Sequence, residues 1–335
     1  MPLSDEPGNL ELGVLLFNLG GPESLADVRP FLFNLFSDPD IIRIKNKALR
    51  CTLAWLIATT RQRKSRSLYR QIGRGSPLRR ITEAQAAALS GLLAARGCRA
   101  GVYVGMRCWK PTIDEAVARI AADRPSQLVL LPLFPQFSVT TTGSCFNYFR
   151  ALARRTGLAD RVEIFSVDEW LEEPLYLEAM ADMIREAQSR FANSDPENIH
   201  LLFSAHSIPA RYVDEGDPYL EQTQKTVALV NERLGGRFPH SLAFQSKVGP
   251  VKWLGPPTTK VLAEIGRRGG SRVLMVPISF VSDHIETLQE IDILYRELAL
   301  KSGIREFHRA PSLNVNPKFI EALANITLRA VVHKQ

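Results

Sequence analysis

The chain has 335 residues, of which 45% are apolar and 23% are charged. This balance is typical of a soluble globular protein with enough apolar side chains for a core, and the length predicts about two domains. The longest apolar stretches, at Leu53–Ala58 and Val273–Val281, are much shorter than the roughly 20 residues of a membrane-spanning helix. We therefore expect no transmembrane helix.

The formal net charge of +7 and the pI of about 9.3 favour an anionic partner. Nucleic acid, an acidic membrane surface and a carboxylate-bearing ligand all fit this charge, and a solvated basic surface is the alternative. The basic residues between Ile41 and Arg66 match no nucleic-acid recognition module. We therefore expect no nucleic-acid partner.

Two features bear on localisation. The first residues, which include Asp5, Glu6 and Glu11, lack the basic and apolar regions of a secretory signal peptide. No two cysteines form a CxxC pair, and thiols that act as small buried apolar groups suit a reducing compartment. We expect a cytoplasmic protein that at most rests peripherally on the inner membrane surface. The cysteines are Cys51, Cys98, Cys108 and Cys145.

The first half of the chain alternates short apolar runs with amphipathic helical patterns, which is typical of α/β units on a mostly parallel sheet. Leu12–Leu19 predicts a first strand. Ser24 is a candidate N-cap of the helix that follows, with Asp27 at its N3 position. The further elements expected are strands at Ala100–Met106 and Gln127–Leu133 and a helix at Thr112–Ala122.

A second set of similar elements follows near residue 165. Two such halves predict one cleft between them, outside the carboxyl ends of their strands. We expect an N-terminal domain at 10–165, a C-terminal domain at 166–312 and a helical segment at 313–335 that packs back on the body. The predicted strands are Val162–Val167, His200–Ser204, Ser241–Gln245 and Arg272–Ile278, and the predicted helices are Pro174–Phe191, Pro218–Leu234, Thr258–Arg267 and Pro317–Val332.

The segment 41–69 combines an apolar centre, Leu53–Ile57, with basic residues on both sides. This pattern indicates an interfacial helix or the lip of an active site. An ordinary amphipathic helix packed on the core is the alternative. The basic residues are Arg43, Lys45, Lys47, Arg50, Arg61, Arg63, Lys64 and Arg66.

The stretch from Val276 to Asp292 is the most informative one. After a predicted strand, polar residues open a helix on which Glu286 and Glu290 are four residues apart and share a face. A carboxylate row of this kind repels itself unless it binds cations or protons. Asp283 and His284 precede it, where they would support and orient a ligand-binding wall. A solvated helix face capped by Asp283 is the alternative.

His206 follows another predicted buried strand. An imidazole at a strand end can accept a proton near neutral pH or bind a metal ion, and a structural histidine is the alternative. His206 and Glu286 each follow a predicted strand, so together they predict two strand-end sites that face one cleft. We expect the imidazole and the carboxylate to confront each other across a slot that admits the substrate.

Two further stretches carry candidate binding residues. Gln245 and Ser246, followed by Lys247, supply donors at a strand end, and Trp253 adds a flat indole face. These groups suit a flat aromatic ligand with acidic arms, although a core tryptophan is the alternative. The aromatic and hydroxyl side chains of 131–147 suit either a pocket wall or a phosphate site, and their spacing does not choose between them.

These stretches together resemble the ferrochelatases over nearly the whole chain. The resemblance implies two Rossmann-like domains with parallel sheets, related by pseudo-two-fold symmetry, with a porphyrin held between them. The matching segments, in family order, are NLGGPES with DVRPFLFNLFSDPDII, YRQIGRGSPL, YVGMRCWKPTIDEA, LPLFPQFS with TTTGS, FSAHSIPARYVDEGDPY, QSKVGPVKWLGP, VPISFVSDHIETLQEID and SLNVNP.

The resemblance also implies roles for single residues. His206 matches the catalytic histidine of the family and Glu286 the acidic residue opposite it, while Glu290 continues the acidic helix. These three would contact the substrate iron transiently. The residues that would contact the porphyrin or shape its entrance are Leu19, Tyr69, Arg61, Arg63, Arg107, Ser246, Trp253 and Phe280, and the supporting residues are Asp283, His284 and Gln245.

This sequence departs from the family pattern at several positions. Phe134 and Phe137 stand where relatives often have tyrosine, and Cys108 replaces another common tyrosine. Leu294 stands where many relatives carry a further acid, which would shorten an outer metal path. No cysteine follows Cys145, so we expect no C-terminal iron–sulfur cluster.

The resulting hypothesis is a metal chelatase without a tightly bound cofactor. It would insert Fe²⁺ into a distorted protoporphyrin IX or coproporphyrin III, with His206 accepting pyrrole protons and the carboxylates guiding the dication. A monomer is favoured. The alternatives are a tetrapyrrole carrier without catalysis, which needs no acidic row near a histidine, and a chelatase that inserts cobalt or nickel into another tetrapyrrole.

Overall fold

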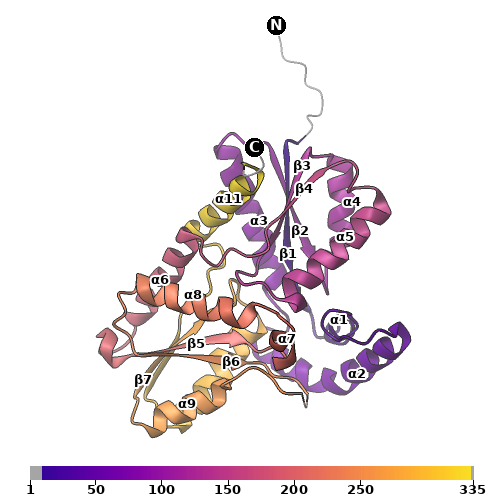
Figure 1. The fold of residues 1–335 in the computed structure, drawn as a ribbon. Coiled ribbons are helices and arrows are strands. Elements are labelled where there is room, and N and C mark those ends of the chain that lie inside the picture. The colour runs from indigo at the N-terminus through magenta and orange to yellow at the C-terminus, as the bar shows by residue number, and fades with distance from the viewer. Residues whose placement is uncertain (1–9, 250, 333–335) are drawn as a thin grey trace.

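The computed structural model describes residues 10–249 and 251–332. The acidic Asp5 and Glu6, and the last three positions of the predicted 313–335 segment, lie outside the described residues. The chain forms two four-stranded parallel sheets with helices around them (Figure 1). This arrangement confirms the predicted α/β fold with two Rossmann-like, chelatase-type sheets.

The two sheets have the same strand order. It is β2-β1-β3-β4 in the first sheet and β6-β5-β7-β8 in the second, so each sheet places its first strand between its second and its third. In the first sheet these strands are β1 (Leu12–Asn18), β2 (Ala100–Met106), β3 (Gln127–Pro132) and β4 (Glu163–Ser166). In the second they are β5 (His200–His206), β6 (His240–Gln245), β7 (Arg272–Pro277) and β8 (Glu306–Arg309).

The repeated order creates one switch point in each sheet, where successive connections leave in opposite directions. Ligands of open α/β sheets bind in the crevice outside the carboxyl ends of the strands at such a point. In the second sheet it lies between β5 and β7, which pair in parallel from His200 opposite Val273 to Ser204 opposite Pro277. Residues that follow these two strands are therefore placed side by side.

Helices connect the strands and cover the sheets. In the N-terminal half they are α1 (Val28–Phe36), α2 (Lys47–Gln71), α3 (Leu78–Ala95), α4 (Ile113–Asp123) and α5 (Ser144–Thr156), with a π-helical turn at Val139–Gly143 before α5. In the C-terminal half they are α6 (Pro174–Gln188), α7 (Ala210–Asp214), α8 (Tyr219–Arg233), α9 (Thr258–Arg267), α10 (Arg296–Lys301) and α11 (Pro317–Val332). A 3₁₀ turn at Pro196–Asn198 and a π-helix at Glu286–Tyr295 complete this half.

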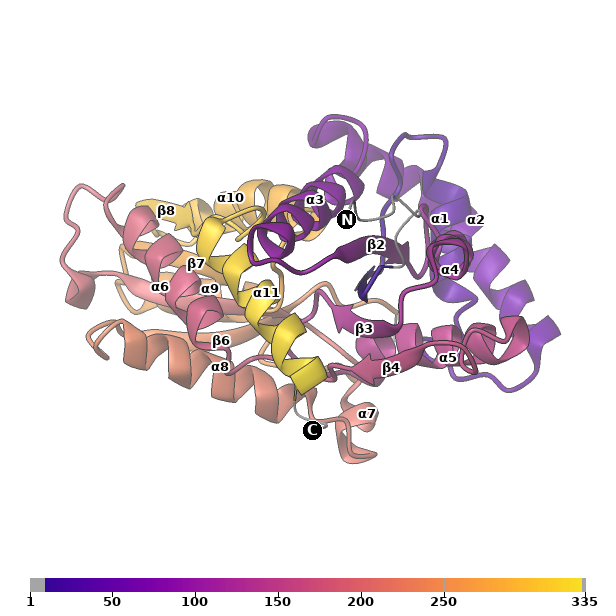
Figure 2. The same cartoon turned by 90° about the horizontal axis from the view of Figure 1, so that it is seen from above.

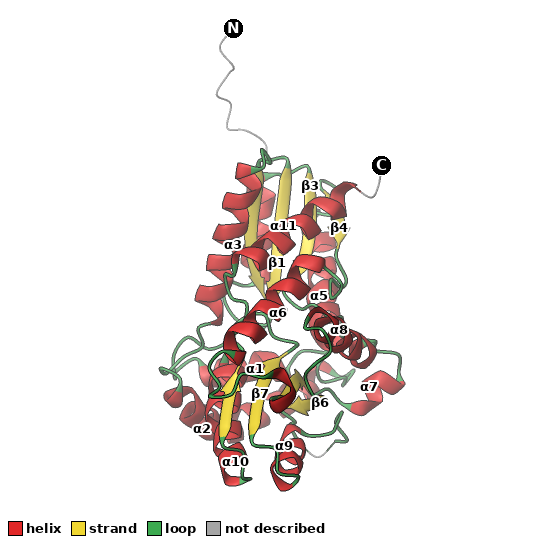
Figure 3. Cartoon of the chain, turned by 90° about the vertical axis from the view of Figure 1, so that its left-hand side faces the viewer, coloured by secondary structure: helices red, strands yellow, loops and turns green. Residues whose placement is uncertain are grey.

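One continuous apolar core joins the two sheets. It contains Leu16 and Leu131 of the first sheet and Phe203 and Val276 of the second, together with the buried face of α11 that includes Phe319. Figures 2 and 3 show α11 lying against α3 and α6, so the end of the chain returns from the second sheet to the first. Burial of this shared apolar surface fixes the two sheets relative to each other.

A smaller cluster holds α1 and α2 beside the second sheet's π-helix. Phe31 of α1 packs with Ala58 and Tyr69 of α2, and Ile285, which directly precedes the π-helix, packs against this cluster. At the end of α2, the Gln71 side-chain oxygen accepts a hydrogen bond from the Gln289 amide at 3.3 Å. The predicted lip therefore rests on the segment that carries Glu286.

Two predictions about elements were wrong, and one strand was missed. The strand predicted at Val162–Val167 was assigned to the second half, but it is β4 of the first sheet. It pairs in parallel with β3, with Glu163 beside Gln127. Strand β8 was not expected from its four residues. Ser24 bonds to the Asp27 carboxylate through its amide and its hydroxyl, but α1 begins only at Val28, so this pair forms a turn before the helix and does not cap it.

A polar network holds the π-helix from the side of β8. The Arg309 guanidinium forms two hydrogen bonds with the Asp292 carboxylate, at 2.8 and 2.9 Å, and a third with Asp283 at 3.0 Å. Asp283 also accepts hydrogen bonds from Ser312 and Asn314. Burial alone would raise the pKa of Asp283, but the positive charge of Arg309 and these hydrogen bonds lower it below its usual value.

This network predicts a pH-dependent contribution to stability. A carboxyl group with a lowered pKa in the folded state stabilises the protein above its unfolded pKa of about 4, and this stabilisation is lost as the pH falls through the lower, folded-state value. We expect Asp283→Asn to reduce the free energy of unfolding by about 2–3 kcal/mol at pH 7, the scale for hydrogen bonds to charged groups. The difference from wild type should shrink below about pH 4. Urea unfolding across the pH range measures it.

Asp182→Asn is the matched control, because Asp182 of α6 pairs with Lys318 and Arg185 at a more accessible site, where its side chain is 34% exposed. Exposed ion pairs contribute about 0–1 kcal/mol, so this variant should unfold nearly like wild type. A loss for Asp283→Asn that is as small as the control's, or that does not change with pH, would contradict the predicted contribution.

Candidate active site

His206 is the last residue of β5, and its backbone is held on both sides. Its amide donates a hydrogen bond to the Ser279 hydroxyl at 3.1 Å, and its carbonyl oxygen accepts one from the Tyr219 hydroxyl at 3.0 Å. Ser279 follows β7, so the first of these bonds joins the two strand ends at the switch point. The side chain of His206 is 37% exposed, which leaves part of the ring open to a ligand.

Glu286 lies directly against this histidine. Its Oε2 atom is 3.0 Å from Nδ1 of His206 and 3.4 Å from Nε2 of His284. Burial would lower the pKa of His206, but the charge and hydrogen bond of Glu286 outweigh burial and raise it above its ordinary value. Burial would raise the pKa of Glu286, but the two histidines hold it well below its usual range. Glu286 therefore stays ionised and raises the affinity of His206 for a proton.

The prediction that His206 and Glu286 confront each other across a slot is wrong. The two side chains are hydrogen-bonded to each other on a single wall. The reason is the strand order: β5 and β7 are adjacent and parallel, so the segments that follow them emerge at the same edge of the sheet. A substrate must contact this pair from one side and cannot enter between its members.

An aromatic ring extends the same wall. The ring centroid of Phe280 lies 6.4 Å from that of His206, edge to face, and 4.6 Å from that of His284. His284 is fixed in turn, because its Nδ1 lies 3.0 Å from the Ser282 carbonyl oxygen. The structure thus brings together four residues that the sequence singled out: His206, Phe280, His284 and Glu286.

Glu290 lies one turn further along the π-helix but does not join the His206 pair. Its carboxylate accepts hydrogen bonds from the Tyr295 hydroxyl at 2.6 Å, from the Gln245 amide and the Ser246 backbone amide, both at 3.1 Å, and from the Ser246 hydroxyl. The acidic row expected from the sequence is therefore divided, since each carboxylate has its own partners. Among residues 10–249 and 251–332, no group of three or more His, Cys, Asp or Glu side chains is arranged to hold a metal ion.

Gln245 and Trp253 flank the site from the side of β6. Gln245 lies opposite His206 in the parallel register, and its amide also donates to the Glu286 carbonyl oxygen at 3.1 Å. Trp253 forms an isolated antiparallel bridge with Pro209, three residues after His206. Gln245 therefore contacts the segment that carries Glu286, and the backbone of Trp253 lies beside the segment that follows His206.

The residues predicted to bind the porphyrin from the N-terminal half have varied environments. Tyr69 is buried in the α1–α2 cluster, where burial and the charge of Glu286 raise its pKa. Leu19 directly follows β1 and is half-buried. Arg61 lies over the Phe36 ring at 5.8 Å, and Arg63 is exposed.

Arg107 is already paired within the protein. Its guanidinium lies 2.9 Å from the fully buried Asp38 carboxylate and also donates to the Ser144 hydroxyl at 2.9 Å. Ser144 in turn donates to Asp38, and the Arg107 guanidinium stacks over the Tyr148 ring at 4.3 Å. A substrate carboxylate would have to share Arg107 with Asp38.

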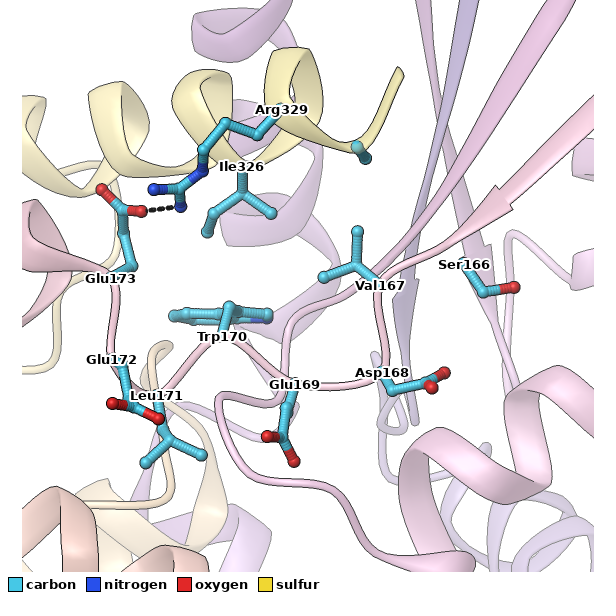
Figure 4. A pocket seen from close by; sticks show the side chains of 11 residues that line it. Ser166, Val167, Asp168, Glu169, Trp170, Leu171, Glu172, Glu173, Ile326 and Arg329 are labelled. Atoms are coloured by element: carbon cyan, nitrogen blue, oxygen red, sulfur yellow. Dashed lines mark hydrogen bonds and ion pairs between the residues drawn. The ribbon is translucent and has the colours of Figure 1, made fainter. Parts of the chain in front are cut away.

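Two cavities of the described chain lie away from this wall. One, of about 450 Å³, lies between the segment after β4 and helix α11, with Trp170 facing Ile326 and an ion pair between Glu173 and Arg329 at one side (Figure 4). The other, of about 490 Å³, is lined by Asp40, Phe137 and Arg150 among others. Neither is lined by His206 or Glu286.

Sequence reasoning missed several residues that hold the site together. Ser279 and Tyr219 fix the backbone of His206, Tyr295 binds Glu290, and Arg309 binds Asp283 and Asp292. Ser279 follows a predicted strand, as His206 does, and this position was a usable signal. The other three come from separate elements, and no local pattern marks them.

Comparison with known proteins agrees with the resemblance. The sequence profile of the Ferrochelatase family matches residues 11–331. The chain is 51% identical over 319 residues to a protein named ferrochelatase from Gloeobacter violaceus, which covers 95% of this chain and 97% of the relative. It is 50% identical over 321 residues to a ferrochelatase of Gloeothece citriformis, with 96% of this chain and 82% of the relative covered.

Solved structures support the fold. SirB from Bacillus subtilis with Fe³⁺ superposes with a TM-score of 0.58 at 12% identity and covers 97% of both chains. The sirohydrochlorin chelatase SirB from Bacillus subtilis subspecies spizizenii, in complex with cobalt, gives a TM-score of 0.52 at 12% identity over 96% of this chain and 95% of that one. With the family profile and the relatives at about 50% identity, the sequence and the site lead to one conclusion: this chain belongs to the ferrochelatase family.

Proposed function

We propose that this protein inserts ferrous iron into a porphyrin, with release of two protons, as a step of haem biosynthesis. One observation carries the assignment of the site: the hydrogen-bonded His206–Glu286 pair at the switch point of the second sheet, beside the ring of Phe280. Iron and the porphyrin are both substrates, and the proposal requires no tightly bound cofactor.

The chemistry needs a proton acceptor beside an apolar surface. A free porphyrin carries two inner N–H groups, and both protons must leave as the metal binds. His206 would take them one at a time and pass each on to water, since its side chain is partly exposed. Nδ1 of His206 faces Glu286, so Nε2 is the ring nitrogen that is open to the substrate. Glu286 stabilises the imidazolium that forms when His206 accepts a proton, in the way that a buried carboxylate supports a general base.

The surrounding residues would shape the macrocycle. Phe280 and Trp253 offer flat faces near the pair, and Leu19 offers an apolar side chain at the end of β1. A wall that fits a bent porphyrin better than a flat one favours the geometry in which a nitrogen lone pair points at the metal. Iron would bind His206 and Glu286 only transiently, since carboxylate and imidazole ligands bind ferrous iron less tightly than thiolates do.

The acidic arms of the substrate would meet the basic mouth formed by Arg61 and Arg63. We favour protoporphyrin IX over coproporphyrin III and a monomeric enzyme. An anaerobic iron-insertion assay with the two porphyrins side by side tests the proposal and the choice of substrate. Binding of porphyrin without any metal insertion would instead support a carrier.

The role of His206 leads to the first prediction on activity. We expect His206→Ala to lower turnover by at least about 100-fold, the scale for loss of a positioned acid–base group, while the porphyrin still binds. Anaerobic initial rates of metalloporphyrin formation and fluorescence titration of the porphyrin measure the two quantities. His240→Ala is the control, because this exposed histidine begins β6 at the opposite edge of the same sheet. Full activity of His206→Ala would refute the assignment.

Glu286→Gln tests the charge of the pair. The amide keeps the shape of the side chain but cannot stabilise an imidazolium, so we expect turnover to fall by about 10-fold or more while the porphyrin dissociation constant changes little. Glu297→Gln, an exposed change on α10, serves as the control. Equal losses of turnover and of porphyrin affinity would indicate that Glu286 is only structural.

We also propose that α2 contacts an anionic membrane surface. No helix among the described residues is long and apolar enough to cross a membrane. However, Leu49, Trp55 and Leu56 of α2 are 58%, 52% and 52% exposed. The basic residues of 41–69 lie on the same segment, and this combination suits a helix that lies in the interface of an acidic bilayer.

Vesicle sedimentation checks this contact. We expect the protein to bind vesicles that contain phosphatidylglycerol more strongly than pure phosphatidylcholine vesicles, and salt to weaken the binding because it screens surface charge. Replacing Trp55 and Leu56 together with serine should reduce binding several-fold, since it removes buried apolar area. Replacing the exposed Leu300 of α10 is the control. Equal binding to both vesicle types would argue against an electrostatic contact.

A further inference from the structure

Glu290 connects the π-helix to the loop that follows β6. Its Oε1 atom accepts from the Tyr295 hydroxyl and the Ser246 amide, and its Oε2 atom accepts from the Gln245 side chain and the Ser246 hydroxyl. Both carboxylate oxygens are therefore already engaged by protein donors. Three of these four bonds come from two consecutive residues at the end of β6.

The backbone of Ser246 shows how this connection works. Ser246 has a φ of +67°, in the left-handed region that residues other than glycine rarely adopt. Such a conformation costs free energy and persists only where the surroundings hold it. The Glu290 carboxylate binds both the backbone amide and the hydroxyl of Ser246, so it holds the turn through which the chain leaves β6.

The far end of the same loop is attached to the segment after His206. The Leu254 amide donates to the Ile208 carbonyl oxygen at 3.0 Å, and the Ala210 amide donates to the Lys252 carbonyl oxygen at 2.9 Å. The Ser207 hydroxyl donates to the Leu254 carbonyl oxygen at 3.0 Å. Among the described residues of this loop, Ser246 is held by Glu290, and Lys252 and Leu254, on either side of Trp253, are held by the neighbours of His206.

We infer that Glu290 is a positioning residue for porphyrin binding: it sets the position of the Trp253 loop relative to the His206–Glu286 pair. The two carboxylates of the π-helix then have separate tasks, because Glu286 acts on the imidazole and Glu290 anchors the loop through Ser246. This inference rests on the proposed contact of Trp253 and His206 with the porphyrin. It replaces the sequence-based expectation that Glu290 contacts the iron.

The test uses Glu290→Gln and Ser246→Gly in the full-length chain. Glutamine keeps the length of the side chain but brings its own N–H groups toward the existing donors, whereas glycine accepts a φ of +67° without strain and loses only the hydroxyl bond. Both variants should weaken porphyrin binding, by about 10-fold for Glu290→Gln and by several-fold for Ser246→Gly, and leave the KM for Fe²⁺ unchanged. Because they disrupt one contact, the double variant should bind porphyrin no more weakly than Glu290→Gln alone.

A spectroscopic reading separates positioning from a general loss of structure. The fluorescence of Trp253 is obtained as the difference between each protein and its Trp253→Phe version. It should change in Glu290→Gln and Ser246→Gly and stay unchanged in the control Glu297→Gln, whose side chain is exposed on α10.

The outcomes distinguish the hypotheses. An increased KM for Fe²⁺ with an unchanged porphyrin dissociation constant would overturn the inference and assign Glu290 to iron handling. Fully additive losses in the double variant, or an unchanged Trp253 signal, would also overturn it. Failure of the wild-type protein to insert iron would instead refute the proposed function.

Discussion

The site depends on a hydrogen-bonded pair of titratable side chains, His206 and Glu286, that is only partly open to water. A carboxylate buried without a partner would take up a proton, and a buried imidazole would lose one. The 3.0 Å contact between Glu286 and His206 reverses both tendencies, and Nε2 of His284 lies 3.4 Å from the same carboxylate oxygen. Each member therefore tunes the proton affinity of the other. The fold must hold two residues that are 80 positions apart in the chain within hydrogen-bonding distance.

The π-helix holds Glu286 in this position because residues from several other elements form hydrogen bonds with the helix. Arg309 of β8 binds Asp292 and Asp283, Ser246 binds Glu290, and His206 binds Glu286. In a π-helix the hydrogen bonds run from residue i to i+5, a geometry that occurs mostly in short pieces at functional sites. These polar contacts hold the wider helix in place and direct its two carboxylates to different strand ends.

The sequence predicted the fold class and most strands, and it singled out His206 and Glu286, but it did not predict how these two side chains are arranged. Buried parallel strands appear as apolar runs, and polar residues just after them mark the carboxyl edge of the sheet, so His206 and Glu286 could be found locally. Strand order is a long-range property that no local pattern reveals. Because β5 lies beside β7, His206 and Glu286 are hydrogen-bonded neighbours and do not face each other across a cleft. For the same reason Arg309, on an unexpected short strand, and Tyr295, inside the helix, gave no local signal.

The repeated topology also allows the equivalent strand ends of the two halves to be compared. β1 and β5 hold the same central position in their sheets and have the same length, so Asn18 ends the first as His206 ends the second. Asn18 is buried and fully engaged, since its amide donates to Thr82 and its side-chain oxygen accepts from the Leu19 amide. The first strand end therefore continues into the apolar Leu19, whereas the second ends on the imidazole that is hydrogen-bonded to Glu286. The two sheets thus share a strand order but differ in the chemistry of their equivalent strand ends, which fits the proposal that the second sheet supplies the proton acceptor.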